Sequence, residues 1–359
     1  MNFDLSEEQE MFRSSVERFA APIDVEARRK LRLSPTGYDK ARWSTLAEMG
    51  LIALAAAEDA GGMGGSPVDL ALVLDALGVA NSPDPLLEHG VLPALLLGSH
   101  DAAEAVLSGE TIATLAWAER AQRYSLTPKS AIADKTAQGY TLSGEKTFVL
   151  GALLADTFIV TAECGGETGL FLVPADAEGL EVRAYRLTDG SIAGEVKLTR
   201  VAVESGARLN CDEADLASVV ASMRLYAAAE MVGLGQRLLD DTITYVKERE
   251  QFGVAIGSFQ ALQHRLVEAY AKAEQSRSML YRAALGDPDD SAAWAKATAG
   301  AKAFISENVD AIAREAVQMH GGMGITDELV IGHAMKRVMV LARLFGDTDS
   351  VLAEYAAAA

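Results

Sequence analysis

Two glycine-containing segments in the last third of the chain carry residue types that suit a phosphate ligand. An arginine offers a fork of N–H donors to a diphosphate, and glycines let a ligand approach the backbone closely. Taken singly, each segment is better explained as a helix end or a turn. The first segment is Arg249-Glu250-Gln251-Phe252-Gly253, followed by Ile256 and Phe259-Gln260, and the second is Gln318-Met319-His320-Gly321-Gly322-Met323-Gly324.

The elements that must position these segments are predicted to be long helices. After Cys211, apolar residues recur three or four positions apart, which is typical of helices with one buried stripe. Short breaks such as Gly286-Asp287-Pro288 separate the stripes, so an antiparallel four-helix bundle is expected. The apolar positions are Val220, Met223, Ala227, Met231, Leu234 and Leu238, then Leu262, Leu266, Tyr270 and Ala273, then Ile305, Val309, Ile312, Ala316 and Met319.

The first third of the chain is also predicted to be helical. Ser6 is expected to cap a helix, with Gln9 at the capping-box position and Met11, Phe12, Val16 and Phe19 on its apolar face. Another helix is expected over about 68–79. The run Gly61–Gly65 lacks the Lys-Ser/Thr of a phosphate-binding loop and is predicted to be a turn.

Between these helical stretches the periodicity changes to that of strands. Short runs rich in β-branched and aromatic residues lie at 112–117, 140–148, 157–161, 169–173 and 195–203. The predicted fold class is therefore α+β, mostly α. Its domains are a helical domain over 1–110, a β-barrel-like domain over 111–210 and a four-helix bundle over 211–359. No βαβ nucleotide-binding unit is predicted.

Composition excludes several classes of function. A formal charge of −19 makes binding to nucleic acid or to anionic lipid unlikely. The two cysteines and five histidines show no paired spacing, so neither a disulfide framework nor a metal site is expected. No apolar run approaches the roughly 20 residues of a membrane span, and the N-terminus lacks a signal peptide, so a cytoplasmic protein is predicted.

Taken together, the two glycine-containing segments resemble the C-terminal signature of acyl-CoA dehydrogenases. The pattern is Arg-x-x-Phe-Gly with a following Phe-Gln, then Gln-x-x-Gly-Gly-x-Gly. The resemblance extends over nearly the whole chain, and also includes Phe3-Asp4-Leu5-Ser6-Glu7-Glu8-Gln9, Trp43-x-x-Leu46-Ala47-Glu48-Met49-Gly50-Leu51, Gly61-Gly62-x-Gly64 and Leu142-Ser143-Gly144-Glu145-Lys146.

This resemblance implies an FAD-dependent oxidoreductase that desaturates an acyl-CoA thioester and passes electrons to an electron-transfer flavoprotein. In that family the two segments cross a dimer interface and hold the adenosine diphosphate part of the neighbouring subunit's FAD. Arg224 resembles a basic residue near the acyl-CoA pocket, although a solvated charge on a helix explains it equally well. The implied cofactor-binding residues are Arg249, Gln251, Phe252, Ile256, Phe259, Gln260, Gln318, Met319, Gly322 and Thr348.

The chain departs from the family at the catalytic base. The family chemistry needs a carboxylate that removes the α-proton while hydride passes to the flavin. The usual aromatic-Glu-Gly-Thr run reads Phe345-Gly346-Asp347-Thr348 here, and the alternative Glu position on the first bundle helix holds Met223. Asp347 is the only nearby substitute, and a role for it as a loop or capping residue is the better interpretation.

The residues that would hold a flavin ring also depart from the family. The Thr-Glu-Pro-x-x-Gly-Ser-Asp run becomes Ala118-Glu119-Arg120-Ala121-Gln122-Arg123-Tyr124, and Trp-Ile-Thr becomes Phe148-Val149-Leu150. The residues for a neighbour's diphosphate are kept, whereas those for the chain's own flavin ring and base are lost. This pattern resembles the Glu-lacking small subunits of heteromeric α2β2 bacterial acyl-CoA dehydrogenases, which include enzymes of steroid side-chain and dicarboxylyl-CoA degradation.

Three hypotheses follow. The first is a heterotetramer subunit that completes a partner's FAD site. The second is a self-sufficient homotetramer that uses Asp347 as its base. The third is a purely structural partner that turns over nothing.

Overall fold

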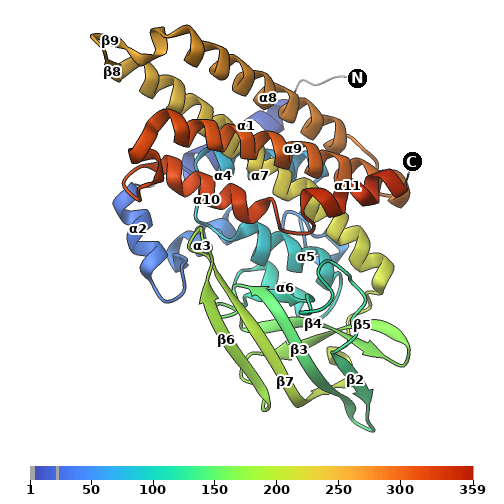
Figure 1. Ribbon diagram of the computed structural model, residues 1–359. Helices are drawn as coiled ribbons and strands as arrows, with labels where there is room; N and C mark the ends of the chain where they lie inside the picture. Colours follow the sequence, from blue (N-terminus) through green and yellow to red (C-terminus); the bar gives the residue numbers. More distant parts are fainter. Residues whose placement is uncertain (1–4, 22–23, 359) are drawn as a thin grey trace. The chain divides into compact units, whose positions relative to one another are not determined.

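The computed structural model describes residues 5–21 and 24–358, and its chain divides into two compact units. Unit 1 contains residues 1–30, 67–83 and 221–359, and unit 2 contains residues 31–66 and 84–220. The N-terminal and C-terminal thirds predicted from periodicity are mainly helical, and the middle third forms a sheet, as Figure 1 shows.

The helices of unit 1 include a bundle built from the C-terminal third. Its helices are α1 (Glu7–Phe19), α4 (Pro67–Val79), most of α7 (Glu213–Glu248), α8 (Gln260–Ala284), α9 (Ser291–His320), α10 (Val330–Leu341) and α11 (Thr348–Ala357). The 3₁₀ turns Ile256–Ser258 (η4) and Gly321–Ile325 (η5) and the hairpin β8 (Glu250–Gln251) and β9 (Val254–Ala255) complete the unit.

The predicted start of α1 is confirmed. The Ser6 hydroxyl accepts a hydrogen bond from the Gln9 backbone N–H at 3.1 Å, and the Gln9 side-chain oxygen accepts one from the Ser6 backbone N–H at 3.1 Å. The expected apolar face is only partly right, because Val16 is fully buried whereas Met11 is 66% exposed. Phe3 and Asp4, which belong to the opening motif, lie outside the described residues.

Helices α4 and α7 pack with their backbones in close contact. A Cβ added to Gly78 would lie 2.2 Å from the carbonyl oxygen of Glu230, and one added to Gly233 would lie 2.0 Å from that of Asp75. Only glycine allows such an approach at these two positions. Helix α7 is long and apolar enough to cross a membrane by composition alone, but 83% of its most apolar window is buried, so it is the core helix of the bundle.

Unit 2 is built around a seven-stranded mixed sheet with strand order β1-β4-β2-β3-β7-β6, and β5 pairs with β4. Strands β1 and β4 run parallel, whereas β3 pairs antiparallel with β7 and β7 pairs antiparallel with β6. The β3–β7 pairing shifts register between Leu142 and Gly144 and again between Lys146 and Val149. The strands are β1 (Ala113–Ala116), β2 (Ile132–Lys135), β3 (Gly139–Leu150), β4 (Thr157–Cys164), β5 (Glu167–Pro174), β6 (Leu180–Arg186) and β7 (Ile192–Glu204).

The helices of unit 2 are short. They are α3 (Lys40–Glu48), the 3₁₀ turn Glu58–Ala60 (η1), a one-turn π-helix Leu87–Val91 (η2), α5 (Leu92–Leu97), α6 (Ala103–Leu107) and the 3₁₀ turn Ser205–Ala207 (η3), and α2 (Val25–Leu33) spans the boundary between the units. The run Gly61–Gly65 is a loop, as predicted. The domain boundaries at 110 and 210 stay predictions, because the compact units cut across them.

Candidate functional site

The Arg-x-x-Phe-Gly segment forms a small hairpin directly after α7. Phe252 and Gly253 both have positive φ, at 57° and 80°, which is the geometry of a tight two-residue hairpin turn. The backbone N–H of Ile256 bonds to the carbonyl oxygen of Arg249 at 2.8 Å and closes the hairpin. The hairpin projects from one end of the bundle, where Figure 1 labels β8 and β9.

The side chains of this hairpin face solvent. Phe252 is 93% exposed, and its ring lies 6.2 Å from that of Phe259 in an edge-on arrangement. Arg249, Gln251 and Gln260 are exposed, and Arg249 makes no ion pair within the described part of the chain. The hairpin therefore presents a guanidinium, two amides and aromatic surface to an external ligand.

The second glycine-containing segment lies beside the first. The Tyr245 ring, one turn before Arg249 on α7, stacks on His320 at the end of α9 with ring centroids 4.2 Å apart. The His320 imidazole is buried and its Nδ1 lies 2.7 Å from the carbonyl oxygen of Ala316. This stacked pair links the two predicted segments. No sequence motif singles out Tyr245, because an aromatic residue on a helical stripe is usually part of the core.

The backbone beyond His320 is open. A Cβ built on Gly321 or Gly322 meets no atom within 4 Å, and the same holds for Gly253. Gln318 is exposed, whereas the Met319 side chain is buried, so Met319 has only its backbone available to a ligand. Exposed backbone, amides and one unpaired arginine form a donor set that suits a diphosphate.

Thr348 and Asp347, also predicted site residues, belong to a separate group at the start of α11. The Asp347 carboxylate caps that helix and accepts a hydrogen bond from the Ser350 N–H at 3.0 Å. Thr348 is the first residue of the helix. The capping role expected as the simpler interpretation of Asp347 is therefore present.

Gly346, which the sequence pattern places at the expected position of the family's catalytic Glu, is closely packed. Its φ is 122°, and an added Cβ would lie 2.6 Å from Cγ1 of Val351 and 3.2 Å from Oγ of Ser350. Val351 is fully buried. Because α11 fills the space into which a side chain at 346 would project, the chain has no vacant slot for a carboxylate there.

Arg224 on α7 forms hydrogen bonds to the segment that contains Gly346 and to α11. Its Nε donates to the carbonyl oxygen of Phe345 at 2.8 Å, and its two Nη atoms bond to the Glu354 carboxylate at 2.6 and 2.9 Å. The Arg224 side chain is only 9% exposed, while Glu354 is 51% exposed. In this structure Arg224 thus joins α7 to α11, and its predicted role in binding substrate stays a prediction.

A buried lysine lies in the same region. The Lys302 ammonium donates to the carbonyl oxygen of Leu341 at 2.8 Å and to the Ser306 hydroxyl at 3.3 Å. Burial, followed by the nearby positive charge of Arg224, lowers the pKa of Lys302 to about 7, although Asp347 partly offsets this. Lys302 was not among the predicted site residues, although it lies three residues before Ile305 and therefore on the predicted buried stripe.

In unit 2, Glu119 has a structural role that the sequence analysis did not assign. Its carboxylate accepts hydrogen bonds from the backbone N–H groups of Lys129, Ser130 and Ala131 and from the Lys146 ammonium, at 2.8 to 3.1 Å. Lys146 is fully buried and also donates to the Thr161 hydroxyl at 3.0 Å. Glu119 therefore connects the backbone of residues 129–131 to the buried Lys146.

The Phe148-Val149-Leu150 run turns at the end of β3. Phe148 has φ 54° and is 38% exposed, whereas Val149 is buried. The Thr114 hydroxyl donates to the carbonyl oxygen of Leu150 at 2.6 Å. The Thr114 hydroxyl is therefore bonded to the backbone of this run. Leu150, which was compared with the Thr of the Trp-Ile-Thr run, has only an alkyl side chain.

Comparisons with known proteins identify the family to which the chain belongs. Acyl-CoA dehydrogenase family models match the chain in three parts: the N-terminal domain at residues 6–108, the middle domain at 114–201 and the C-terminal domain at 216–359. Acyl-CoA dehydrogenase IpdE2 of Mycolicibacterium smegmatis is 32% identical over 354 residues, covering 95% of this chain and 96% of the relative. The chain belongs to the acyl-CoA dehydrogenase family.

Two solved structures of paired chains are similar to this one. The Mycobacterium tuberculosis ChsE4-ChsE5 complex contains a chain that is 26% identical, with a TM-score of 0.89, covering 99% of this chain and 98% of that one. The Tcur3481-Tcur3483 steroid ACAD has a chain that is 27% identical, with a TM-score of 0.86 and coverage of 98% and 97%. Members of the acyl-CoA dehydrogenase family are FAD-dependent oxidoreductases, so the predicted fold, enzyme class and cofactor are confirmed.

Proposed function

We propose that this acyl-CoA dehydrogenase is one subunit of a heterotetramer and completes the FAD site of an unlike partner. One contrast carries the proposal. The diphosphate-binding residues are exposed and open at the end of unit 1, whereas the position of the base is a glycine packed against Val351. A self-sufficient enzyme needs both sets of residues.

The residues present fit the diphosphate part of FAD. Arg249 would pair with phosphate oxygens, and the open space beside Gly321 and Gly322 would let a phosphate approach the backbone there, although the Gly321 N–H itself donates to the carbonyl oxygen of Gln318. Phe252 and Phe259 would pack against the flat parts of the dinucleotide. When bound, FAD supplies the hydride acceptor for acyl-CoA desaturation, and the base would come from the partner.

Exposed apolar residues on the hairpin, on η5 and on α8 support an assembly. Phe252 is 93% exposed, Ile325 71%, Val267 66% and Tyr270 54%. Large exposed apolar side chains of this kind are typical of a surface that a partner covers. The paired chains of the two similar solved structures support an unlike partner.

The substrate proposed is an acyl-CoA thioester with an acyl group derived from a steroid or another lipid. The similarity to the steroid ACAD supports the steroid class. The two cysteines are free thiols, which fits the reducing cytoplasm, and an electron-transfer flavoprotein is the proposed acceptor.

Flavin stoichiometry tests the proposal. The chain should be purified alone and after co-expression with an acyl-CoA dehydrogenase subunit that retains the Glu base, and FAD per chain should be measured by absorbance. Little flavin is expected for the chain alone, and about half an FAD per chain for the complex. One FAD per chain alone, bleached by acyl-CoA, would instead establish the homotetramer.

An Arg249→Ala variant tests the trans contact. Loss of a charge-assisted hydrogen bond to phosphate should weaken FAD binding by the complex about tenfold or more. Arg282→Ala, which removes an exposed arginine from α8, is the matched control and should leave FAD binding unchanged. Unchanged flavin content and activity in Arg249→Ala would favour the purely structural role.

A further inference from the structure

Two helices of unit 1 end beside the two segments assigned to the cofactor. Tyr245 lies in the last turn of α7, and its carbonyl oxygen accepts the backbone N–H of Arg249 at 2.8 Å. His320 is the last residue of α9 and directly precedes Gly321. Each segment therefore continues from a helix end that carries one aromatic ring.

Each segment also packs closely on its own helix. In the turn after the hairpin, a Cβ added to Gly257 would lie 3.0 Å from the carbonyl oxygen of Val246 on α7. In η5, a Cβ added to Gly324 would lie 2.7 Å from the carbonyl oxygen of Val317 on α9. The separation of the two segments therefore depends on how the ends of α7 and α9 are joined.

The stacked rings of Tyr245 and His320 join these two helix ends. Their centroids are 4.2 Å apart and their planes differ by 23°. The His320 side chain is buried, and its Nδ1 lies 2.7 Å from the carbonyl oxygen of Ala316. Because a carbonyl oxygen can only accept, Nδ1 is the donor, and this bond holds the imidazole in the orientation that stacks on the tyrosine.

An ion pair also connects this part of the bundle, but it is exposed. Arg265 on α8 contacts the Glu315 carboxylate on α9 at 2.6 Å, and the two side chains are 38% and 37% exposed. Water and salt weaken an ion pair of this kind. A stacked aromatic pair contributes more than its buried area alone and does not depend on charge, so it is better suited to fix the spacing of the two segments.

One diphosphate needs both segments at a fixed spacing. Arg249 offers the positive charge from the hairpin, and the open space beside Gly321 and Gly322 admits a phosphate to the second segment. A single ligand uses both contacts at once only when the segments lie at the separation that it spans. Segments that moved independently would have to be ordered on binding, which would lower the affinity.

We propose that Tyr245 and His320 are positioning residues for FAD, because their stacked rings hold Arg249 and the Gly321–Gly322 backbone at the spacing of one diphosphate. The inference rests on the proposed function, since FAD must reach this end of unit 1 for the spacing to matter. Neither ring needs to touch the cofactor. The pair makes one site out of two segments that lie far apart in the sequence.

The test measures the FAD dissociation constant of the co-expressed complex by flavin fluorescence. Tyr245→Leu keeps an apolar side chain without the ring, and should weaken FAD binding about two- to tenfold, the range expected for one aromatic stack. Tyr245→Phe keeps the ring and should bind FAD as the wild-type complex does. His320→Gln removes the other ring and should weaken binding to a similar degree, so the test does not depend on the folding of one variant.

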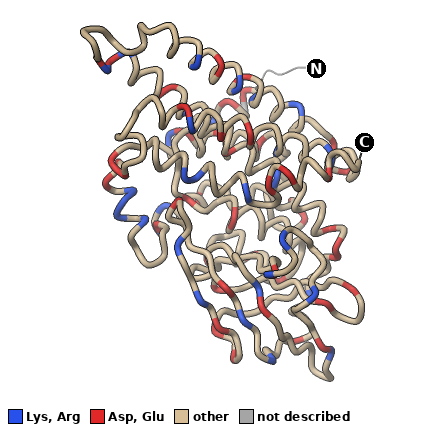
Figure 2. The backbone as a smooth tube through the Cα atoms, viewed as in Figure 1, with Lys and Arg blue, Asp and Glu red and all other residues tan. Residues whose placement is uncertain are grey.

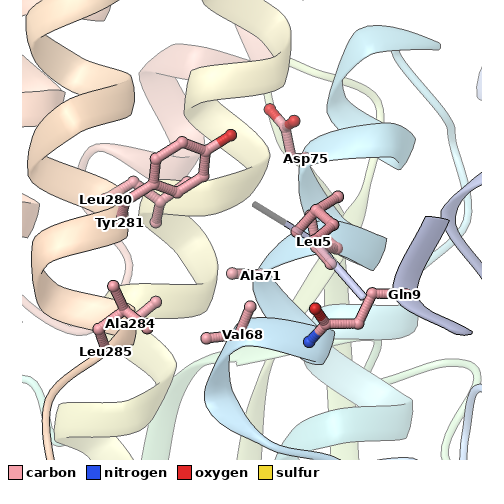
Figure 3. Close-up of a pocket in the computed structure, with 10 residues that line it drawn as sticks. Leu5, Gln9, Val68, Ala71, Asp75, Leu280, Tyr281, Ala284 and Leu285 are labelled. Atoms are coloured by element: carbon pink, nitrogen blue, oxygen red, sulfur yellow. The ribbon is translucent and has the colours of Figure 1, made fainter. Parts of the chain in front are cut away.

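Tyr281→Leu is the matched control. Tyr281 is half-buried like Tyr245, but it lies about 30 Å along α8 from Gln260. There it lines a cavity between α1, α4 and α8, as Figure 3 shows. Loss of its ring should lower the free energy of unfolding and leave the FAD dissociation constant unchanged. An equal loss of FAD affinity in this control would overturn the inference, because bundle stability would then set the affinity.

Combination with Arg249→Ala separates positioning from general destabilisation. If the stack acts by placing the Arg249 guanidinium, Tyr245→Leu should have little further effect on FAD binding once Arg249 is replaced. Fully additive losses would overturn the inference. Unchanged FAD binding in Tyr245→Leu, with a loss in Arg249→Ala, would overturn it and leave the proposed function intact, whereas unchanged binding in Arg249→Ala would overturn both.

Discussion

At the scale of single residues, the packing around Gly346 determines whether a carboxylate could be placed at this position. A missing carboxylate could in principle be restored by one substitution. Here, however, a Cβ at residue 346 would lie 2.6 Å from a fully buried Val351, and φ is 122°. The surrounding residues therefore leave no space for a side chain at 346, and Arg224 is bonded to Phe345 and Glu354.

We therefore predict that Gly346→Glu destabilises the chain and does not create a base. The strained backbone and the collision with Val351 should lower the free energy of unfolding by about 1–3 kcal/mol. Urea unfolding measures the loss, and acyl-CoA-dependent bleaching of flavin measures activity. Gly206→Glu is the control, because a Cβ at Gly206 meets no atom within 4 Å. A stable Gly346→Glu chain that turns over acyl-CoA by itself would contradict this account.

The sequence predicted some of the individual site residues but not the side-chain pairs that they form. The Arg249 and Gly321 motifs were evident because unusual residue types recur at fixed spacing. The Tyr245–His320 stack and the Lys302 contacts were not, since aromatic and long-chain residues on a helix stripe have no local signature of their partner. Which side chain meets which depends on how the helices are packed, and a periodic pattern does not specify that.

At the scale of elements, strong helical periodicity predicted the helices well, and short strands were less evident. Strand β2 was missed because only Ala133 of its four residues is buried. Strand β6 was also missed, although Leu180, Val182 and Ala184 alternate with polar residues. Tyr270 was expected on the buried stripe of α8 but is 54% exposed, so that interpretation was wrong for the single chain.

The Glu119–Lys146 pair acts on a whole segment, because it connects the loop after β1 to strand β3. Burial by itself would raise the pKa of Glu119, but hydrogen bonds from Lys146 and from the backbone of Lys129 and Ser130 lower it to about 2. A carboxylate with a lowered folded pKa stabilises the fold above its unfolded value, near 4.5, and loses that effect as the pH falls toward 2.

We predict that Glu119→Gln is destabilised most at neutral pH. The variant leaves the buried Lys146 ammonium without its carboxylate, which costs on the order of 3–5 kcal/mol. The difference in the free energy of unfolding between the variant and the wild-type chain should be constant above about pH 5. It should shrink as the pH falls from 4.5 toward 2, because the wild-type Glu119 carboxyl then becomes protonated. Urea unfolding across this range measures it. Glu145→Gln, an exposed neighbour on β3, should show no such trend. If the difference in the free energy of unfolding between Glu119→Gln and the wild-type chain grew as the pH fell, the stabilising role assigned to the Glu119 carboxylate would be ruled out.

At the scale of the whole molecule, charge opposes association of the chain with itself. Each copy carries a formal charge of −19, and Figure 2 shows acidic residues spread over most elements. The exposed apolar residues Val267 and Tyr270 on α8 favour association, but Glu268 and Glu274 are exposed on the same helix. Two copies therefore repel each other at the surface that their apolar side chains would bury.

We predict that the chain by itself associates weakly at low ionic strength and more strongly as salt is added. The screening length falls from about 30 Å at about 0.01 M to about 8 Å at about 0.15 M salt, which weakens repulsion between like charges. Sedimentation velocity across this range measures the shift. Replacing both Glu268 and Glu274 with Gln should raise association at low salt, whereas the same change at the exposed Glu178 and Glu181 of unit 2 should have a smaller effect. Association that weakens as salt rises would show that attractive ion pairs hold the copies together, and would contradict the charge repulsion argued here.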